Sequence, residues 1–379
     1  MSARSIVSPD DQPVTFVELF FDLVFVFSVT QLVGLFHDGI GWVVIGEAVL
    51  IFWLVWWAWT QFTWALNAAD TTHPAIAAAT LLATAVAFFM AVALPDAFHG
   101  RALFFAVPYI LVRGIGIVVY GEVAHAADPD QHAAVRRFAT LSLLGLAAVL
   151  AGAIWSGWQW WLWSLAILFD IVAARLAGES EAWNLHPEHF SERHGLFVII
   201  ALGETLIVSA AGVSGADWTG QLIGVVVVAV GLTCALWWAY FARVKGMLDA
   251  ALEDASSRNR APVARDAFSL LHFVLLCGVV AYAVVLEAAV HHPGDPFDAA
   301  TRAAVGVGLV LYLGGAAAAL YRATGRVLGP RVALTLGTAA AVVAAAPVPP
   351  IATLAIAVVG VTAVTAAESR AGVGERVAP

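Results

Sequence analysis

Long apolar stretches, interrupted only by short polar segments, are the feature that most constrains what this chain can fold into. The hydrocarbon core of a bilayer is about 30 Å thick, and an α-helix needs about 20 apolar residues to cross it. Only 12% of the 379 residues are charged and 61% are hydrophobic, whereas a soluble domain carries about 25% charged residues. This composition excludes a water-exposed globule and predicts an all-α integral membrane protein.

Apolar stretches of the length needed for a membrane-spanning helix recur along the whole chain. Twelve candidates are predicted: 15–36, 41–64, 75–94, 102–121, 138–155, 158–177, 193–213, 220–242, 266–290, 302–321, 331–347 and 349–367. The last two are rich in alanine and are separated mainly by prolines, so a shorter hairpin is the alternative there. We therefore expect about 12 transmembrane helices, within a range of roughly 10 to 12. The first apolar stretch lacks the features of a secretory signal peptide and is expected to be a transmembrane helix.

Positive charges gather on one side of this predicted topology. With twelve helices, 15 of the 18 Lys and Arg residues fall on the side that holds both chain ends. Because cytoplasmic loops carry an excess of Lys and Arg, we expect the N- and C-termini in the cytoplasm. The longest hydrophilic stretch, 243–265, is expected to be a solvated cytoplasmic connector.

The two halves of the sequence resemble each other. Thr-Phe-Val-Glu at 15–18 aligns with His-Phe-Ser-Glu at 189–192, and Val-Trp-Trp-Ala-Trp at 55–59 aligns with Leu-Trp-Trp-Ala-Tyr at 236–240. Since halves of six helices have the same orientation, we expect two parallel repeats, with chance recurrence of aromatic motifs as the alternative. The expected division is a first six-helix membrane half at 1–177, a cytoplasmic linker at 178–192 and a second six-helix membrane half at 193–379.

Ionisable residues lie inside several of the predicted helices. A charge at the centre of a bilayer costs at least about 2.5–3.5 kcal/mol, so it needs a partner or a water-filled cavity. Glu18 and Asp22 are four residues apart and share one helical face. Arg113 is expected to neutralise either Asp22 or Asp170, and Glu204 is expected nearer the midplane. A structural role in pairing helices is the alternative for these charges, and we prefer it for Arg113.

Three histidines gather with acidic residues where the seventh predicted helix begins. They are His186, His189 and His194, interleaved with Glu188 and Glu192. Imidazoles and carboxylates are metal ligands, but this spacing matches no metal motif. We predict a pH-sensitive or solvated helix entrance, with His189 and His194 as the candidate pH-sensing residues. Neither a metal ion nor another cofactor is expected.

Two separated blocks of sequence resemble the bacterial low temperature requirement protein A family. The first runs from Glu18-Leu-Phe-Phe-Asp22 to Gln31-Leu32, and the second is His189-Phe-Ser-Glu-Arg-His194 through Glu204. The resemblance covers essentially the whole chain and implies a multi-spanning protein of the bacterial plasma (inner) membrane. The family name describes a growth phenotype and implies no molecular activity. The resemblance directs attention to the motif positions Glu18, Asp22, Gln31, Glu192, Arg193, His194 and Glu204.

Buried carboxylates and the parallel repeat favour a transporter or channel for a small solute or ion. The residues predicted to bind this substrate or ion are Glu18, Asp22, Gln31, Arg113, Asp170 and Glu204. An enzyme is not expected, because no nucleophile motif is present, although a membrane-embedded enzyme acting on lipid and a membrane scaffold or sensor remain the alternatives. The expected partners are the lipid bilayer and a small solute or ion. No basic run suits nucleic acid, and the sequence carries no signal for an oligomeric state.

Overall fold

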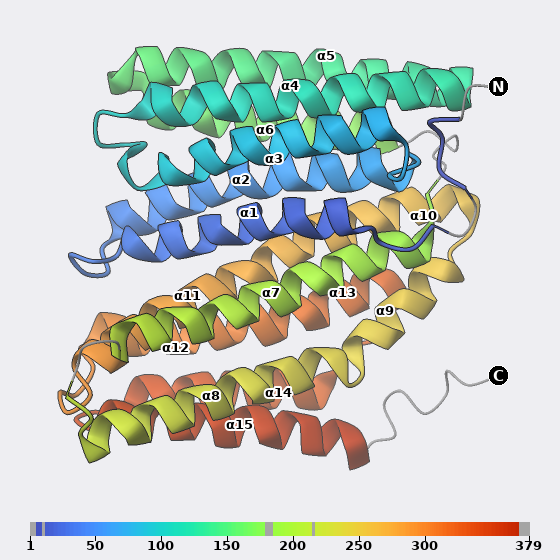
Figure 1. The fold of residues 1–379 in the computed structure, drawn as a ribbon. Helices are drawn as coiled ribbons and strands as arrows, with labels where there is room; N and C mark the ends of the chain where they lie inside the picture. Colours follow the sequence, from blue (N-terminus) through green and yellow to red (C-terminus); the bar gives the residue numbers. More distant parts are fainter. Residues whose placement is uncertain (1–4, 10–11, 179–184, 214–216, 371–379) are drawn as a thin grey trace. The chain divides into compact units, whose positions relative to one another are not determined.

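The computed structural model describes residues 5–9, 12–178, 185–213 and 217–370, and this part of the chain is built from helices (Figure 1). Its β-structure is limited to an isolated antiparallel bridge between Val7 and Ala69. Eleven of the described helical segments are long and apolar enough to cross a membrane, and a shorter apolar helix spans Gly329–Ala344. The predicted all-α, multi-pass membrane fold is therefore confirmed, with a helix number inside the expected range.

The first half of the chain supplies seven long helices. They are α1 (Phe16–Gly34), α2 (Trp42–Asn67), α3 (Pro74–Val92), α4 (Ala102–Ala127), α5 (Pro129–Ile154), α6 (Gln159–Gly178) and α7 (Pro187–Val213). Helix α5 begins well before the predicted position 138. The carboxylate of Asp128 accepts hydrogen bonds from the backbone N–H groups of Asp130 and Gln131, and Pro129 occupies the first helical position. Both features start a helix, so α5 has polar first turns ahead of its apolar stretch.

The second half of the chain is more interrupted. Its helices are α8 (Gly220–Phe241), α9 (Val244–Glu253), α10 (Ser257–Val263), α11 (Leu271–His291), α12 (Ala299–Leu309), α13 (Gly315–Thr324), α14 (Gly329–Ala344) and α15 (Pro350–Arg370). π-Helical turns at Ala264–Leu270 and Val310–Gly314 join α10 to α11 and α12 to α13. The last two predicted stretches form separate helices, α14 and α15, and not the shorter hairpin that was the alternative there.

The hydrophilic stretch 243–265, expected to be a solvated connector, is largely helical. Helix α9 buries an apolar face that includes Met247, Leu248 and Leu252, while Lys245 pairs with Asp249 at 2.5 Å on a partly exposed face. An apolar stripe with charges opposite is the pattern of a helix lying on other structure. The stretch is therefore not solvated on all sides, and its helical period was not recognised because the charged residues dominate the short sequence.

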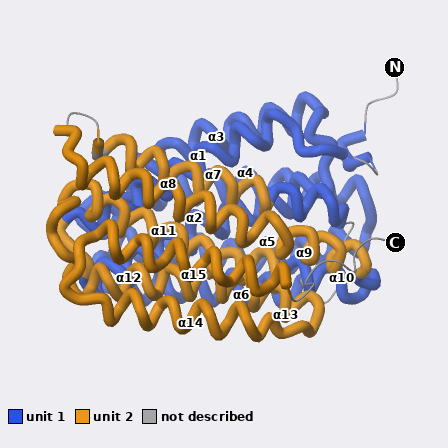
Figure 2. Tube along the Cα trace, turned by 90° about the horizontal axis from the view of Figure 1, so that it is seen from below, with its two compact units in different colours: residues 1–37, 41–193, 255–265 blue, residues 38–40, 194–254, 266–379 orange. Residues whose placement is uncertain are grey.

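The chain divides into two compact units, which Figure 2 distinguishes by colour. Unit 1 contains Met1–His37, Gly41–Arg193 and Ala255–Arg265, and unit 2 contains Asp38–Ile40, His194–Asp254 and Asp266–Pro379. The division along α7 therefore falls between Arg193 and His194. The expected halves and the linker at 178–192 stay predictions. Residues 179–184 of that linker lie outside the described part, and from Pro187 onward it forms the start of α7.

Both units use a similar order of neighbouring helices. In unit 1, contacts connect α3 to α4, α4 to α5, α5 to α6 and α6 to α2. In unit 2, contacts connect α11 to α12, α12 to α14, α14 to α15 and α15 to α8. The aligned Trp-Trp motifs lie in α2 and α8, which occupy matching places in the two orders. The predicted parallel repeat stays a prediction, and the two orders agree in this respect.

Candidate functional site

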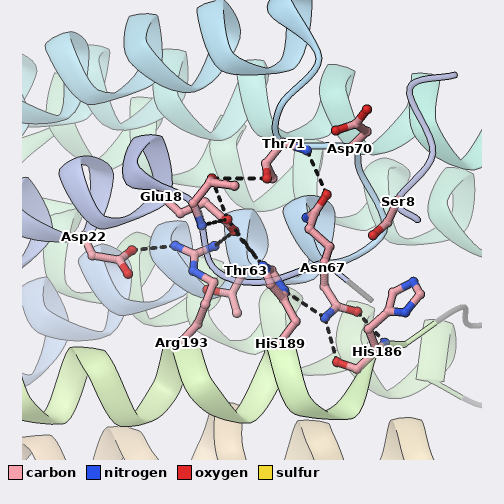
Figure 3. Close-up of polar contacts among 12 residues, drawn as sticks. Ser8, Glu18, Asp22, Thr63, Asn67, Asp70, Thr71, His186, His189 and Arg193 are labelled. Carbon is pink, nitrogen blue, oxygen red and sulfur yellow. Dashed lines mark hydrogen bonds and ion pairs between the residues drawn. The ribbon is translucent and has the colours of Figure 1, made fainter. Parts of the chain in front are cut away.

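Buried charged side chains from α1 and α7 meet within unit 1, as Figure 3 shows. Glu18 and Asp22 come from α1, and His189 and Arg193 come from α7. None of these four residues is more than 3% exposed. Each helix presents its two residues with a spacing of four, which places them on one face. We call these four residues the α1–α7 charge cluster.

Arg193 is the centre of the α1–α7 charge cluster. Its Nη2 donates to Asp22 Oδ1 at 2.5 Å, and its Nη1 lies 3.5 Å from Glu18 Oε1. Nε2 of His189 lies 3.1 Å from Glu18 Oε1 and 3.3 Å from Oε2. One guanidinium therefore serves two carboxylates, and one of these carboxylates also contacts an imidazole.

Trp59 of α2 fixes the Asp22 side of the cluster. Its indole Nε1 donates to Asp22 Oδ1 at 2.6 Å, and its ring lies under the Arg193 guanidinium, 5.5 Å from ring centroid to Cζ. A guanidinium over an indole face adds a cation–π attraction. Asp22 Oδ1 thus receives two donors, whereas Oδ2 is buried and has no hydrogen-bond partner among the described residues.

Glu18 also helps to begin α1. Its Oε2 accepts from the backbone N–H of Thr15 at 3.0 Å and from Thr15 Oγ1 at 2.9 Å, completing a capping box at the helix start. Thr15 Oγ1 lies 3.1 Å from Thr71 Oγ1, just beyond α2. Oε2 of Glu18 thus has a structural role in the capping box, whereas Oε1 faces His189 and Arg193.

Asn67, the last residue of α2, holds the beginning of α7. Its Oδ1 accepts from the backbone N–H of His186 at 2.9 Å, and its Nδ2 donates to the His186 carbonyl at 2.9 Å. The same Nδ2 lies 3.2 Å from Nδ1 of His189. One amide therefore connects α2, the entry to α7 and the imidazole of the cluster (Figure 3).

The charges of the cluster do not balance. Two carboxylates face one guanidinium, so with a neutral imidazole one negative charge is left over in a site without solvent exposure. A buried charge without compensation is expensive, and such a group takes up a proton or an ion instead. The arrangement is therefore chemically suited to hold one proton or one small cation.

Arg113 and Asp170 form a separate buried pair in unit 1. Arg113 Nη2 donates to Asp170 Oδ1 at 3.0 Å and lies 3.2 Å from Ser142 Oγ, and Nη1 donates to Tyr109 Oη at 2.9 Å. Of the two partners considered for Arg113, the structure thus selects Asp170. The pair is electrically neutral, which agrees with the structural role that we preferred for Arg113.

The remaining predicted site residues lie elsewhere along their helices. Gln31 is half-buried in α1, and thirteen helical residues place it about 20 Å from Glu18. Glu204 is half-buried in α7, about 16 Å along the helix from Arg193. His194 is fully buried in unit 2, where its ring centroid lies 5.5 Å from that of His272. Their predicted roles stay predictions.

Sequence reasoning did not place Arg193, Trp59 or Asn67 in the site. Arg193 and Arg331 are among the 15 cations that the sequence assigned to the side of the chain ends, yet both are fully buried. The spacing of His189 and Arg193, which equals that of Glu18 and Asp22, was the available signal for Arg193. Trp59 and Asn67 had no such signal, because nothing in the local sequence separates them from other polar and aromatic residues of α2.

Comparisons with known proteins place the chain in a family. A model of the bacterial low temperature requirement A protein family matches residues 13–366. An uncharacterized protein of Rhizobium meliloti (strain 1021) is 30% identical over 302 residues, which cover 75% of this chain and 71% of that protein. No solved structure matches the chain. The match includes both sequence blocks that supply the α1–α7 charge cluster, and the chain belongs to the bacterial low temperature requirement A family.

Proposed function

We propose that this multi-pass membrane protein is a transporter or channel for a small solute or ion, and that the α1–α7 charge cluster is its ion-binding site. The observation that carries this proposal is the charge imbalance of the cluster. Glu18 and Asp22 share Arg193, and Asp22 Oδ2 has no partner among the described residues. A site of this kind gains from binding a proton or cation, and ionisable groups inside membrane proteins mark ion pathways by default.

The proposal includes the bacterial plasma membrane as the location and cytoplasmic ends for the chain. The Lys and Arg distribution supports this orientation even after Arg193 and Arg331 are removed from the count of loop cations. The α1–α7 charge cluster then lies toward the cytoplasmic ends of α1 and α7.

Flux through liposomes that hold the purified full-length protein tests this function. Proton, sodium and potassium gradients are imposed in turn, and movement of the ion is followed with an ion-sensitive dye. We expect flux in the wild type and a loss of at least about tenfold in Asp22→Asn. The substitution keeps Oδ1 as an acceptor for Trp59 and Arg193 and places the amide nitrogen at the unpartnered Oδ2 position.

A double variant of unit 2, Arg331→Met with Glu368→Met, is the matched control. It removes one buried carboxylate and its guanidinium, which pair with each other outside the cluster. Replacing a buried ion pair by apolar residues of similar volume is often neutral for stability, so flux should persist. Equal flux in the wild type and in Asp22→Asn, or no flux under any gradient, contradicts the proposal.

A further inference from the structure

The orientation of the Asn67 amide is fixed by backbone groups. The N–H of His186 can only donate and its carbonyl can only accept, so the atoms facing them must be Oδ1 and Nδ2 of Asn67 respectively. This assignment needs no assumption about the neighbouring histidine. The amide N–H₂ group of Asn67 is therefore also the group that lies against Nδ1 of His189.

A donor against Nδ1 determines where His189 carries its proton. Nδ1 must accept from Asn67, so the ring hydrogen is on Nε2, which faces the Glu18 carboxylate at 3.1 Å. The imidazole in this arrangement is neutral, because a doubly protonated ring donates from both nitrogens. Glu18 and Asp22 together with Arg193 then carry one net negative charge.

A second proton on His189 would balance the charge of the cluster, but it conflicts with Asn67. The new Nδ1–H would point at the Asn67 N–H₂ group, and two donors cannot bond to each other. Either the amide or the ring must turn away. Because the amide also holds both backbone groups of His186, its departure would release the residue that immediately precedes α7.

The charged and titratable groups around His189 come from several elements. Helix α1 presents Glu18 and Asp22, α7 presents Arg193, and His186 lies just before α7. Asp70 follows α2 and is engaged by Thr72 through Oδ1 at 2.6 Å. The α2 residues in contact with the cluster, Trp59 and Asn67, are uncharged. Among these groups, the carboxylate that contacts the imidazole is that of Glu18.

We propose that the ion bound by the α1–α7 charge cluster is a proton, that His189 takes it up at Nδ1, and that Asn67 couples this uptake to release of the start of α7. This inference rests on the proposed function, since it names the ion of that site. On uptake, an O–H bond of hydronium breaks and the Nδ1–H bond forms, leaving water; release reverses both changes, and the cluster goes from one net negative charge to none on uptake. Asn67 and His189 thereby form a two-state element, because either the amide contact or the second ring proton is present.

Nitrogen NMR of the full-length protein, labelled at histidine and purified in detergent, tests the inference without any ion gradient. His189 is assigned by the signal missing from His189→Gln, and spectra are recorded from pH 9 to pH 5. We expect the neutral Nε2–H form at high pH and the doubly protonated ring at low pH. In Asn67→Asp the new carboxylate accepts from Nδ1–H, so the midpoint should move to higher pH by about one unit or more.

Asn259→Asp is the matched control, because it adds the same charge at an exposed position of α10 and should leave the midpoint within about 0.3 of a unit. Hydrogen exchange supplies the second readout. After correction for the intrinsic pH dependence of exchange, the amides of His186 and of residues 188–190 should be at least about tenfold less protected at pH 5 than at pH 8, and this loss of protection should vanish in His189→Gln.

The outcomes separate the two proposals. A His189 ring that keeps one protonation state from pH 9 to pH 5 in the wild type overturns the proton assignment, even if sodium or potassium flux is measured. An unchanged midpoint in folded Asn67→Asp overturns the role of Asn67. A protein that titrates as expected but shows no flux under any gradient refutes transport and leaves the protonation switch standing.

Discussion

Arg331 in unit 2 and Arg193 in unit 1 are both buried against carboxylates, yet the charges are balanced only around Arg331. In unit 2, Arg331 Nε donates to Glu368 Oε1 at 2.6 Å and Nη2 donates to Oε2 at 3.0 Å. Nη2 also donates to the carbonyl of Ala239 at 2.7 Å. In unit 1, Arg193 serves both Glu18 and Asp22, and Asp22 Oδ2 has no partner among the described residues.

This difference shows that burial of charge alone does not identify a functional site in a membrane protein. The Arg331–Glu368 pair is neutral, and both carboxylate oxygens accept hydrogen bonds, so nothing is gained when it binds or loses a proton. It joins α14 to α15 and ties α14 to the end of α8. The α1–α7 charge cluster, by contrast, has a surplus negative charge and an open acceptor, so its protonation or ion occupancy can change.

The largest effect that tests the comparison is expected from Glu368→Gln. The substitution leaves Arg331 charged and buried, and it turns an accepting oxygen into an amide donor that faces a guanidinium donor. Breaking a buried pair in this way costs about 3–5 kcal/mol. Thermal unfolding in detergent should show the loss at every pH from 5 to 9, because a guanidinium stays protonated throughout.

The double variant Arg331→Met with Glu368→Met should recover most of that lost stability, since it leaves no unpaired charge. A loss below about 1 kcal/mol in Glu368→Gln would contradict the structural role of the pair.

Removing the guanidinium from the cluster should give a loss of stability that depends on pH. Arg193→Gln leaves Glu18 and Asp22 in one buried site without their cation. Their mutual repulsion and burial make the folded variant bind protons more readily than its unfolded chain, so its stability falls as pH rises. Thermal unfolding should show a deficit of about 3 kcal/mol at pH 8 that shrinks toward pH 5. A deficit that is equal at both pH values would show that the two carboxylates do not share the guanidinium.

The sequence was sufficient to predict the membrane-spanning helices and insufficient to predict how they associate. Membrane-spanning segments depend on local composition, so α3 begins within one residue of the predicted position 75. Helix ends beyond the bilayer depend on caps instead, which is why α5 starts at Pro129 and not at 138. The α9 helix was missed because its charges dominate a short stretch.

The side of the site that α1 supplies could be predicted for a similar reason. Glu18 and Asp22 lie on one helix, and a spacing of four residues is visible in the sequence. Arg193 lies at the edge of a distant apolar stretch. At such an edge, the sequence does not distinguish an arginine in a loop from an arginine that pairs with a buried carboxylate. The bond from Trp59 to Asp22 joins residues 37 positions apart, and only the packing of α1 against α2 brings them together.

Helix caps provide a smaller contrast between the units. Glu18 caps α1 while facing the cluster, whereas Asp298 caps α12 and accepts from the Thr301 N–H at 2.7 Å in an exposed position. Asp298→Ala should therefore cost about 0.5–1 kcal/mol of stability at pH 7 and should not change flux. Asp298→Asn, which keeps the acceptor oxygen, is the control.

The cap of α12 should also respond to pH with a known sign. Hydrogen bonds from Thr301 hold the pKa of the Asp298 carboxyl below its ordinary value of 3.8. A carboxyl with a lowered pKa in the folded state contributes stability above its ordinary pKa, and this contribution is lost as pH falls through the folded value. The difference between wild type and Asp298→Ala should thus be constant from pH 8 to pH 5 and shrink below about pH 4. A difference that grows on acidification would contradict this cap.

The smallest effect on stability is expected where the effect on function is largest. Asp22→Asn keeps the oxygen that accepts from Trp59 and Arg193, and its new amide group occupies the position of Oδ2, where no donor of the described residues opposes it. The variant also cancels the surplus charge, leaving Glu18 and Arg193 as a neutral pair. We therefore expect its unfolding free energy to stay within about 1 kcal/mol of the wild type.

Asp170→Asn is the matched comparison for Asp22→Asn, because it makes the same chemical change in unit 1. It leaves Arg113 without a carboxylate, since Asp170 is its only carboxylate partner among the described residues. It should lose about 3 kcal/mol, measured by thermal unfolding beside Asp22→Asn in the same detergent. If the two variants are equally destabilised, the cluster is as balanced as the other buried pairs, and the physical reason for treating it as an ion site disappears. If only Asp170→Asn is destabilised, the cluster does carry a surplus negative charge at Asp22. Because the fold is then equally stable without this charge, the charge serves a function other than stability.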